Sequence, residues 1–272
     1  MGKFLDKTRR INNYIQSQAQ YPVDFKELLP ILAEELEANA YLVGREGRIL
    51  GCGFVQNHEC EIMASCRADG NTLPKEFNDK LVKMIETSEN MQNGDGCFIW
   101  EGSRCPFSSK FLTVIPIFAG EERLATLALV RFDRELDEKD LAIAESAATA
   151  IGLEIVRAKS ERLAEETRKM AAVHMALETL SFSEQEAVGY IFDELNGQEG
   201  LLVASKIADK AGITRSVIVN ALRKFESAGV IESRSLGMKG TYIRVLNDKL
   251  FDELERIKTR TGPSKLAIDM GM

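Results

Sequence analysis

Residues 204–229, ASKIADKAGITRSVIVNALRKFESAG, decide how this chain is interpreted. In both halves of the stretch, apolar residues recur at the spacing that gives a helix one buried face, and Gly212 separates the halves. A glycine there indicates the end of the first helix, because glycine readily adopts the left-handed backbone of a helix C-terminus. Thr214 is then the expected N-cap of a second helix over residues 215–228. Two short helices and a tight turn predict a helix-turn-helix.

The second predicted helix has a polar face suited to DNA. Its donors to base edges come at the start of the helix, where a recognition helix reads the major groove. The side chains expected on this face are Arg215, Ser216, Asn220, Arg223 and Lys224.

Residues 230–246 predict two short strands around the turn RSLGMKG at 234–240, in which Arg234 and Lys239 are cations. This basic hairpin extends the helix-turn-helix to a winged form. Between residues 201 and 245 there are eight Lys/Arg and three Asp/Glu, whereas the whole chain has a net charge of −7. A basic island in an acidic protein is typical of nucleic-acid binding. The alternative is a winged helix that binds only other proteins.

The whole chain has the composition of a folded protein of about two domains. It has 272 residues, of which 44% are hydrophobic and 28% charged. Neither a membrane-spanning apolar run nor a secretory signal is visible. The five cysteines are an odd number, which favours reduced thiols and a cytoplasmic location.

Residues 1–136 predict an α+β sensor domain of the GAF/PAS type. Two helices come first, over 4–19 and from the cap Asp24 to 38, the second kinked or split at Pro30. A hairpin around residues 44–47, a short helix near 62–63 and a helix over 74–87 follow, with a loop at 90–96. Strands are expected over 97–100, 111–119 and 124–132. Such folds carry a loop-walled pocket for a small ligand, although fold alone does not establish function.

Residues 137–181 contain no proline and predict a long linker helix and dimerisation element. Two bent helices, each packed on its own domain, are the alternative. Ser183 and Glu186 form a capping-box pattern at the start of a helix to residue 195, which opens a winged helix-turn-helix domain over 182–260. Residues 261–272 are expected to form a loosely held tail.

Residues 201–246 resemble the winged-helix segment of the CodY family, and FLDKTRRIN at 4–12 and FLTVIPIFAGEERLATLALVR at 111–131 are similar to that family as well. The resemblance implies a nutrient-responsive global transcription regulator, mainly a repressor. It also implies a homodimer or tetramer, A·T-rich palindromic operators, and branched-chain amino acids or GTP as effectors.

The resemblance assigns residues to two sites. For GTP it implies a basic hairpin and part of the linker helix. In the hairpin, Glu46 replaces a basic residue of the family and so weakens the attraction for phosphates. The GTP candidates are Gly44, Arg45, Glu46, Arg48, Glu154 and Lys159. The DNA-binding residues that match the family are Ala204, Ser205, Thr214, Arg215, Ser216, Asn220 and Lys239.

An amino-acid pocket is implied as well, but the family's carboxylate-binding Arg is missing, since residues 60–63 read CEIM. The resemblance therefore supports GTP more strongly than a branched-chain amino acid. The pocket candidates are Tyr41, Met63, Arg67, Leu73, Ile99 and Trp100.

Two other functions are kept as alternatives. The first is a redox- or metal-responsive regulator that uses the sensor thiols, although the spacing of His58, Cys60 and Cys66 matches no standard zinc module. The second is a guanine-nucleotide hydrolase. The sequence lacks a GxxxxGK[ST] loop and any obvious nucleophile with a base, so neither an enzyme nor a catalytic cofactor is expected.

Overall fold

The structure is a computed structural model that describes residues 2–17, 23–55, 61–107, 109–195 and 197–261. It divides into two compact units, Met1–Ser160 and Glu161–Met272, and the division falls inside one helix, α5 (Glu138–Glu178). The expected linker is therefore one helix of 41 residues rather than two bent ones.

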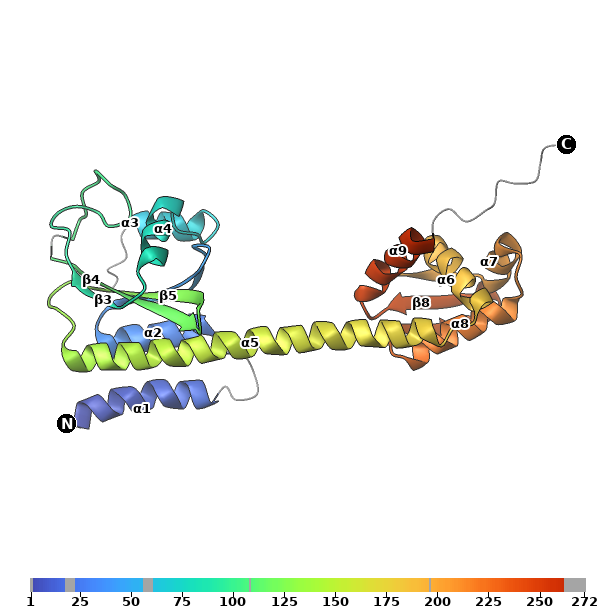
Figure 1. The fold of residues 1–272 in the computed structure, drawn as a ribbon, viewed down its shortest axis with the longest axis horizontal. Helices are drawn as coiled ribbons and strands as arrows, with labels where there is room; N and C mark the ends of the chain where they lie inside the picture. Colours follow the sequence, from blue (N-terminus) through green and yellow to red (C-terminus); the bar gives the residue numbers. More distant parts are fainter. Residues whose placement is uncertain (1, 18–22, 56–60, 108, 196, 262–272) are drawn as a thin grey trace. The chain divides into compact units, whose positions relative to one another are not determined.

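The first unit is built on a five-stranded antiparallel sheet with the order β2-β1-β5-β4-β3. Helices cover both faces of this sheet, with α2 and α5 on one and α3 and α4 on the other (Figure 1). Its elements before α5 are α1 (Gly2–Ser17), α2 (Phe25–Leu36), β1 (Asn39–Gly44), β2 (Ile49–Gly53), α3 (Glu61–Ala68), α4 (Lys75–Lys83), β3 (Ser88–Met91), β4 (Phe111–Ala119) and β5 (Glu122–Arg131).

Alternation along β1 separates two cores. Ala40 and Leu42 pack toward α2 and α5, whereas Tyr41 and Val43 pack toward α3 and α4. The second core includes Met63 of α3 and surrounds the pocket described below. The order of helices and strands is that of the expected GAF-like α+β domain.

Helix α2 lies unusually close to β2. Cβ atoms added at Gly51 and Gly53 would lie 2.6 Å from the Phe25 carbonyl oxygen and 2.2 Å from that of Leu29. Asp24 caps α2 as expected, because its Oδ1 accepts from the backbone N–H of Lys26 at 2.8 Å. The expected split at Pro30 is wrong, since α2 continues through it.

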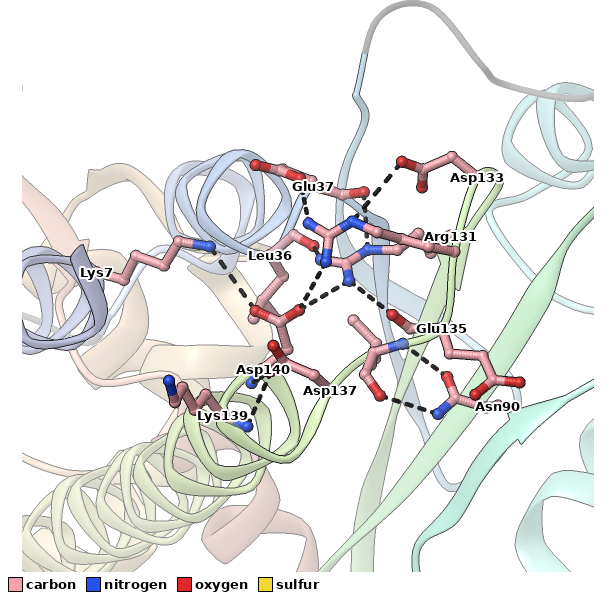
Figure 2. Close-up of polar contacts among 12 residues, drawn as sticks. Lys7, Leu36, Glu37, Asn90, Arg131, Asp133, Glu135, Asp137, Lys139 and Asp140 are labelled. Atoms are coloured by element: carbon pink, nitrogen blue, oxygen red, sulfur yellow. Dashed lines mark hydrogen bonds and ion pairs between the residues drawn. The ribbon is translucent and has the colours of Figure 1, made fainter. Parts of the chain in front are cut away.

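A buried ion pair joins three elements of the first unit. Arg131 of β5 is fully buried, and its Nη1 donates to Asp140 Oδ2 at 2.7 Å in the first turn of α5. The guanidinium also donates to the carbonyl oxygens of Leu36, Glu37 and Glu135. Figure 2 shows this cluster at the end of α2. It fixes the start of α5 against the sensor core.

Three expectations between residues 74 and 100 are wrong. Helix α4 ends at Lys83 rather than 87, and residues 88–91 are the edge strand β3 where the expected loop begins. Residues 97–100 form no strand. They turn instead, because Cys97 Sγ accepts from the backbone N–H groups of Ile99 and Trp100 at 3.4 and 3.5 Å.

The second unit packs helices on a three-stranded sheet with the order β6-β8-β7. Its core includes Phe192, whose ring meets those of Phe225 and Phe251 edge to face. Two elements were not expected from the sequence, β6 (Glu199–Leu202) and α9 (Lys249–Thr261). The others are α6 (Phe182–Leu195), α7 (Ala204–Ala211), α8 (Arg215–Ser227), β7 (Ile231–Ser235), the 3-10 turn η1 (Gly237–Lys239) and β8 (Thr241–Val245).

The capping box of α6 lies two residues earlier than expected. Ser181 N–H donates to Glu184 Oε2 at 2.7 Å, and Glu184 N–H donates to Ser181 Oγ at 3.4 Å. Ser183 and Glu186 are therefore the wrong pair, because the helix begins at Phe182. Most of the expected tail, residues 262–272, lies outside the described residues.

Candidate DNA interface and effector sites

Helices α7 and α8 form the expected helix-turn-helix. Gly212 ends α7 with φ 66° and ψ 27°, the left-handed conformation expected of it. Ile218, Ala221, Leu222 and Phe225 of α8 are buried. Arg215, Ser216 and Asn220 are exposed, as a base-reading face requires.

Neither helix has a side-chain cap at its N-terminus. Thr214 occupies the N-cap position of α8, but the expected capping bond is wrong, because its Oγ1 pairs with Ser216 Oγ at 2.8 Å. Val203 precedes Ala204 and Ser205 at the start of α7 and offers no polar side chain. No side chain thus competes with an outside acceptor, such as a phosphate, for the first-turn backbone N–H groups of either helix.

The cations of residues 201–245 fall into two groups. One group is held within the unit: Lys206 and Lys210 pair with Glu194, Arg244 with Glu232, and Lys224 with Glu184. The other group is exposed, and within the described part of the chain its members make no ion pair. These cations are Arg215, Arg223, Arg234 and Lys239. The positive charge available to a ligand is therefore concentrated on α8 and the wing.

An apolar cavity of about 80 Å³ lies on the α3–α4 side of the sensor sheet. Of the six candidates, Tyr41, Met63, Leu73 and Ile99 line it, and Arg67 and Trp100 do not. Arg67 instead stacks its guanidinium 5.0 Å from the ring centre of Phe54. Trp100 is half-exposed beside a shallower hollow at α3.

Lys110 also lines the cavity, and it could not be picked out from the sequence, because there it simply precedes an apolar strand. Its Nζ donates to the carbonyl oxygens of Gly94 at 2.8 Å and Phe107 at 3.1 Å. Only 5% of the residue is exposed. Lys110 and Asn39 are thus polar members of a lining that is otherwise mostly apolar.

The nucleotide candidates lie around one end of the sensor sheet. The register of β1 on β5 pairs Gly44 with Ala125, which brings the β1–β2 turn beside the start of β5. Glu122 at that start holds Lys159 of α5 at 2.7 Å. This bond, helped by the more distant charge of Arg45, lowers the pKa of Glu122 below its usual value. Glu122 is a member of this neighbourhood that the sequence did not suggest.

Glu154, a further candidate, has an unsatisfied carboxylate oxygen. Its Oε2 is buried and accepts no hydrogen bond, although Arg157 Nη1 lies 3.5 Å away. Arg45, Glu46 and Arg48 are exposed on the turn. The structure thus brings Lys159 to the start of β5, whereas among the described residues Glu154 pairs with Arg157 and makes no hydrogen bond or ion pair with the turn.

The family comparisons cover both units. Residues 3–179 match the family model described as the CodY GAF-like domain, and residues 198–258 match the CodY helix-turn-helix domain. The chain belongs to the CodY family.

Curated CodY relatives extend over nearly the full chain. The global transcriptional regulator CodY of Clostridium botulinum strain Okra is 53% identical over 258 residues, which are 95% of this chain and 100% of that protein. The CodY of strain Alaska E43 is 54% identical over the same shares. A solved structure, the cofactor binding GAF domain of the nutrient sensor CodY from Clostridium difficile, has 31% identity, covers 56% of this chain and 96% of that chain, and gives a TM-score of 0.42.

The thiols of this CodY-family chain show no metal site within the described ranges. Cys97 and Cys105 are free thiols, and no group of three His, Cys, Asp or Glu in those ranges could hold a metal ion. His58 and Cys60 lie outside the described residues. Among the helices that the structure describes, none combines the length and apolar character needed to cross a bilayer.

Proposed function

We propose that this CodY-family chain is mainly a repressor, whose affinity for operator DNA changes when a small effector binds the sensor unit. The observation that carries the proposal is the segregation of cations in the second unit. Arg215, Arg223, Arg234 and Lys239 are exposed and unpaired in the described structure, while the other four cations of residues 201–245 are bound to carboxylates. Acting on chromosomal DNA, the protein would work in the cytoplasm.

The recognition helix α8 enters the major groove with its N-terminus first. Arg215, Ser216 and Asn220 then reach base edges or the adjoining backbone. Arg223, Arg234 and Lys239 meet phosphates. Lys224 is omitted from this set, since its ammonium is held by Glu184.

Helix α7 approaches the phosphate backbone. The first-turn N–H groups, including those of Ala204 and Ser205, would donate to a phosphate oxygen, because no side chain caps this helix. The same argument applies to α8 after Thr214. Such contacts orient the protein on the duplex and carry no sequence information.

The protein would act as a homodimer on A·T-rich palindromes, since a two-fold protein matches a two-fold site. Leu153 and Val156 of α5 support this proposal, because they are 67% and 40% exposed beside a partly apolar groove with Phe118. Light scattering distinguishes a dimer from a tetramer.

GTP is the proposed effector at the turn after β1. Arg45, Arg48 and Lys159 would pair with phosphates, and the unsatisfied Glu154 Oε2 would accept from the guanine edge. Lys159 must then leave Glu122, which makes the phosphate compete with a carboxylate already in place.

The test is fluorescence anisotropy of a labelled operator duplex, titrated with the full-length protein with and without GTP. GTP should tighten binding, and Lys159→Met should remove the GTP effect while basal DNA binding remains. Arg162→Met is the matched control, because Arg162 is exposed on the same helix and pairs with Glu166. An unchanged GTP response in Lys159→Met would contradict this effector site.

A further inference from the structure

Helix α4 is hydrogen-bonded to the turn that joins β1 to β2, named here the basic turn, residues 44–48. Asn78 of α4 donates from Nδ2 to the carbonyl oxygen of Arg45 at 3.0 Å. Just before α4, the backbone N–H of Leu73 donates to the carbonyl oxygen of Gly47 at 2.9 Å. A Cβ added at Gly47 would lie only 3.2 Å from Asn78 Cγ. The helix therefore holds the backbone of the basic turn.

The oxygen of the Asn78 carboxamide is unsatisfied. Only 7% of the residue is exposed, and within the described residues its Oδ1 accepts no hydrogen bond. A buried oxygen without a donor costs stability, and an apolar side chain of the same size would avoid this cost. What the asparagine supplies here is the bond from Nδ2 to the basic turn.

The last turn of α4 is bound to the start of β5. Arg123 is 6% exposed, and its guanidinium donates to the carbonyl oxygens of Leu81 at 3.3 Å and Met84 at 2.6 Å. A cationic donor is favourable at the C-terminal carbonyls of a helix. The residue before it, Glu122, holds Lys159 of α5 at 2.7 Å. Both parts of the proposed nucleotide site, the basic turn and the Glu122–Lys159 pair, are therefore attached to one short helix.

We propose that Asn78 and Arg123 are positioning residues, through which α4 sets the spacing between the basic turn and the Glu122–Lys159 pair. This deepens the proposed function and rests on it, because the spacing decides whether the cations of both parts reach the phosphates of one nucleotide together. Binding groups of this kind need to be held to within about 0.5 Å by the residues behind them. A short helix with a hydrogen bond at each end provides that constraint.

The experiment is isothermal titration calorimetry of the full-length protein with GTP and with GMP. The unaltered protein should bind GTP more tightly, because the longer phosphate chain meets both groups of cations. Asn78→Leu and Arg123→Met should each weaken GTP binding by about tenfold, the scale of one charged hydrogen bond, and change GMP binding by less than about twofold. Arg123→Lys should retain most of the GTP affinity, since it keeps a donor for the α4 carbonyl oxygens.

Thr113→Val is the matched control. Thr113 of β4 is 1% exposed, and its Oγ1 accepts from the backbone N–H of Asn90 at 3.0 Å. Its neighbours Leu112 and Val114 belong to the core beside α3 and α4, so Thr113 lies on the opposite face of the sheet. Its replacement should lower stability and leave the ratio of GTP to GMP affinity unchanged. Positioning residues change that ratio, whereas residues that only support the fold do not.

Hydrogen exchange of the unaltered protein tests the same link without a variant, so a variant that fails to fold does not remove the test. GTP should slow the exchange of backbone N–H groups over residues 73–84, because it fixes the elements bound to both ends of α4. Exchange at Asn90, whose N–H is bound to Thr113, should stay unchanged.

Three outcomes overturn the inference alone. They are unchanged GTP binding in both variants, equal weakening of GTP and GMP binding, and unchanged exchange over residues 73–84 when GTP binds. Absence of GTP binding by the unaltered protein would overturn the proposed effector and the inference with it. Lys159→Met separates the two, because it tests the effector site while both hydrogen bonds to α4 remain.

Discussion

The ammonium of Lys224 lies 2.6 Å from Glu184 Oε2, and this bond ties the recognition helix α8 to the start of α6. Lys224 also donates to the carbonyl oxygen of Thr179 at 2.7 Å, just beyond the end of α5. The same Glu184 oxygen accepts from Ser181 N–H at 2.7 Å. One carboxylate is thus both a helix cap and a counter-ion, which fixes α8 relative to the helices before it.

Replacing Glu184 by Gln should lower the stability of the second unit by about 2 kcal/mol, the scale of one charged hydrogen bond. Gln preserves an acceptor for the cap but leaves Lys224 without its counter-ion. Urea unfolding followed by circular dichroism measures the change. Glu232→Gln is the control, because Glu232 pairs with Arg244 on the surface, and it should change stability little.

Glu184 should also make the stability of the second unit depend on pH. The hydrogen bond from Lys224, followed by that from Ser181 N–H, lowers the pKa of Glu184 below its usual value. A carboxyl whose pKa is lower in the folded state stabilises the fold above its unfolded pKa, near 4.5, and this contribution is lost as pH falls through the folded pKa. Unfolding midpoints measured from pH 6 to pH 3 should fall less steeply for Glu184→Gln. Parallel curves would contradict the assignment.

Asp140→Asn should destabilise the first unit by about 3 kcal/mol, since it leaves the fully buried Arg131 guanidinium without a charged partner. Arg134 provides the comparison with a half-exposed partner, because its guanidinium lies 3.8 Å from the same carboxylate. Arg134→Met should cost much less in the same unfolding experiment. Equal losses for the two variants would show that burial of Arg131 is not what matters.

Gly53→Ala should also destabilise the first unit, by about 1–3 kcal/mol, the usual range for overpacking. Its new Cβ would lie 2.2 Å from the Leu29 carbonyl oxygen and would push α2 away from β2. Gly44 in the same hairpin is the control, since its added Cβ meets nothing closer than 3.5 Å. Thermal melts of Gly53→Ala and Gly44→Ala separate the two causes. A lower melting temperature in Gly53→Ala alone indicates the close helix–strand contact, and equal losses indicate a general loss of backbone freedom.

Local patterns in the sequence predicted the helix-turn-helix well. The αL residue Gly212, the buried side of α8 and the β4–β5 hairpin all follow from spacing of apolar residues and from turn chemistry between near neighbours. Asp24 as a cap is of the same kind.

Features made by distant partners could not be predicted in this way. From the sequence alone, Lys224 is predicted to contact a phosphate. In the fold its ammonium is bound by Glu184, which is forty residues away in the chain. From the sequence alone, Lys110 is an exposed residue before a strand. In the fold its ammonium is bound by the carbonyl oxygen of Gly94. The turn at Cys97 replaces a strand because a side-chain sulfur accepts the N–H groups that a ladder would use.

The wing, residues 231–245, should contribute to DNA affinity through its positive charge alone. Arg234→Met and Lys239→Met should each lower the slope of log affinity against log salt by about one unit, because each removes one phosphate contact. Binding to all sequences should weaken together. Lys206→Met is the control, since its ammonium is already bound to Glu194. Anisotropy titrations at several salt concentrations give the slopes.

The most direct test of the account is competition binding of full-length protein and Arg215→Ala to an A·T-rich palindromic duplex against random duplex of equal length. The unaltered protein should show a salt-sensitive preference for the palindrome, and Arg215→Ala should lose about 1–3 kcal/mol of that preference with little change on random DNA. A protein that binds both duplexes equally, or an Arg215→Ala variant with undiminished preference, would contradict the assignment of α8 as the recognition helix.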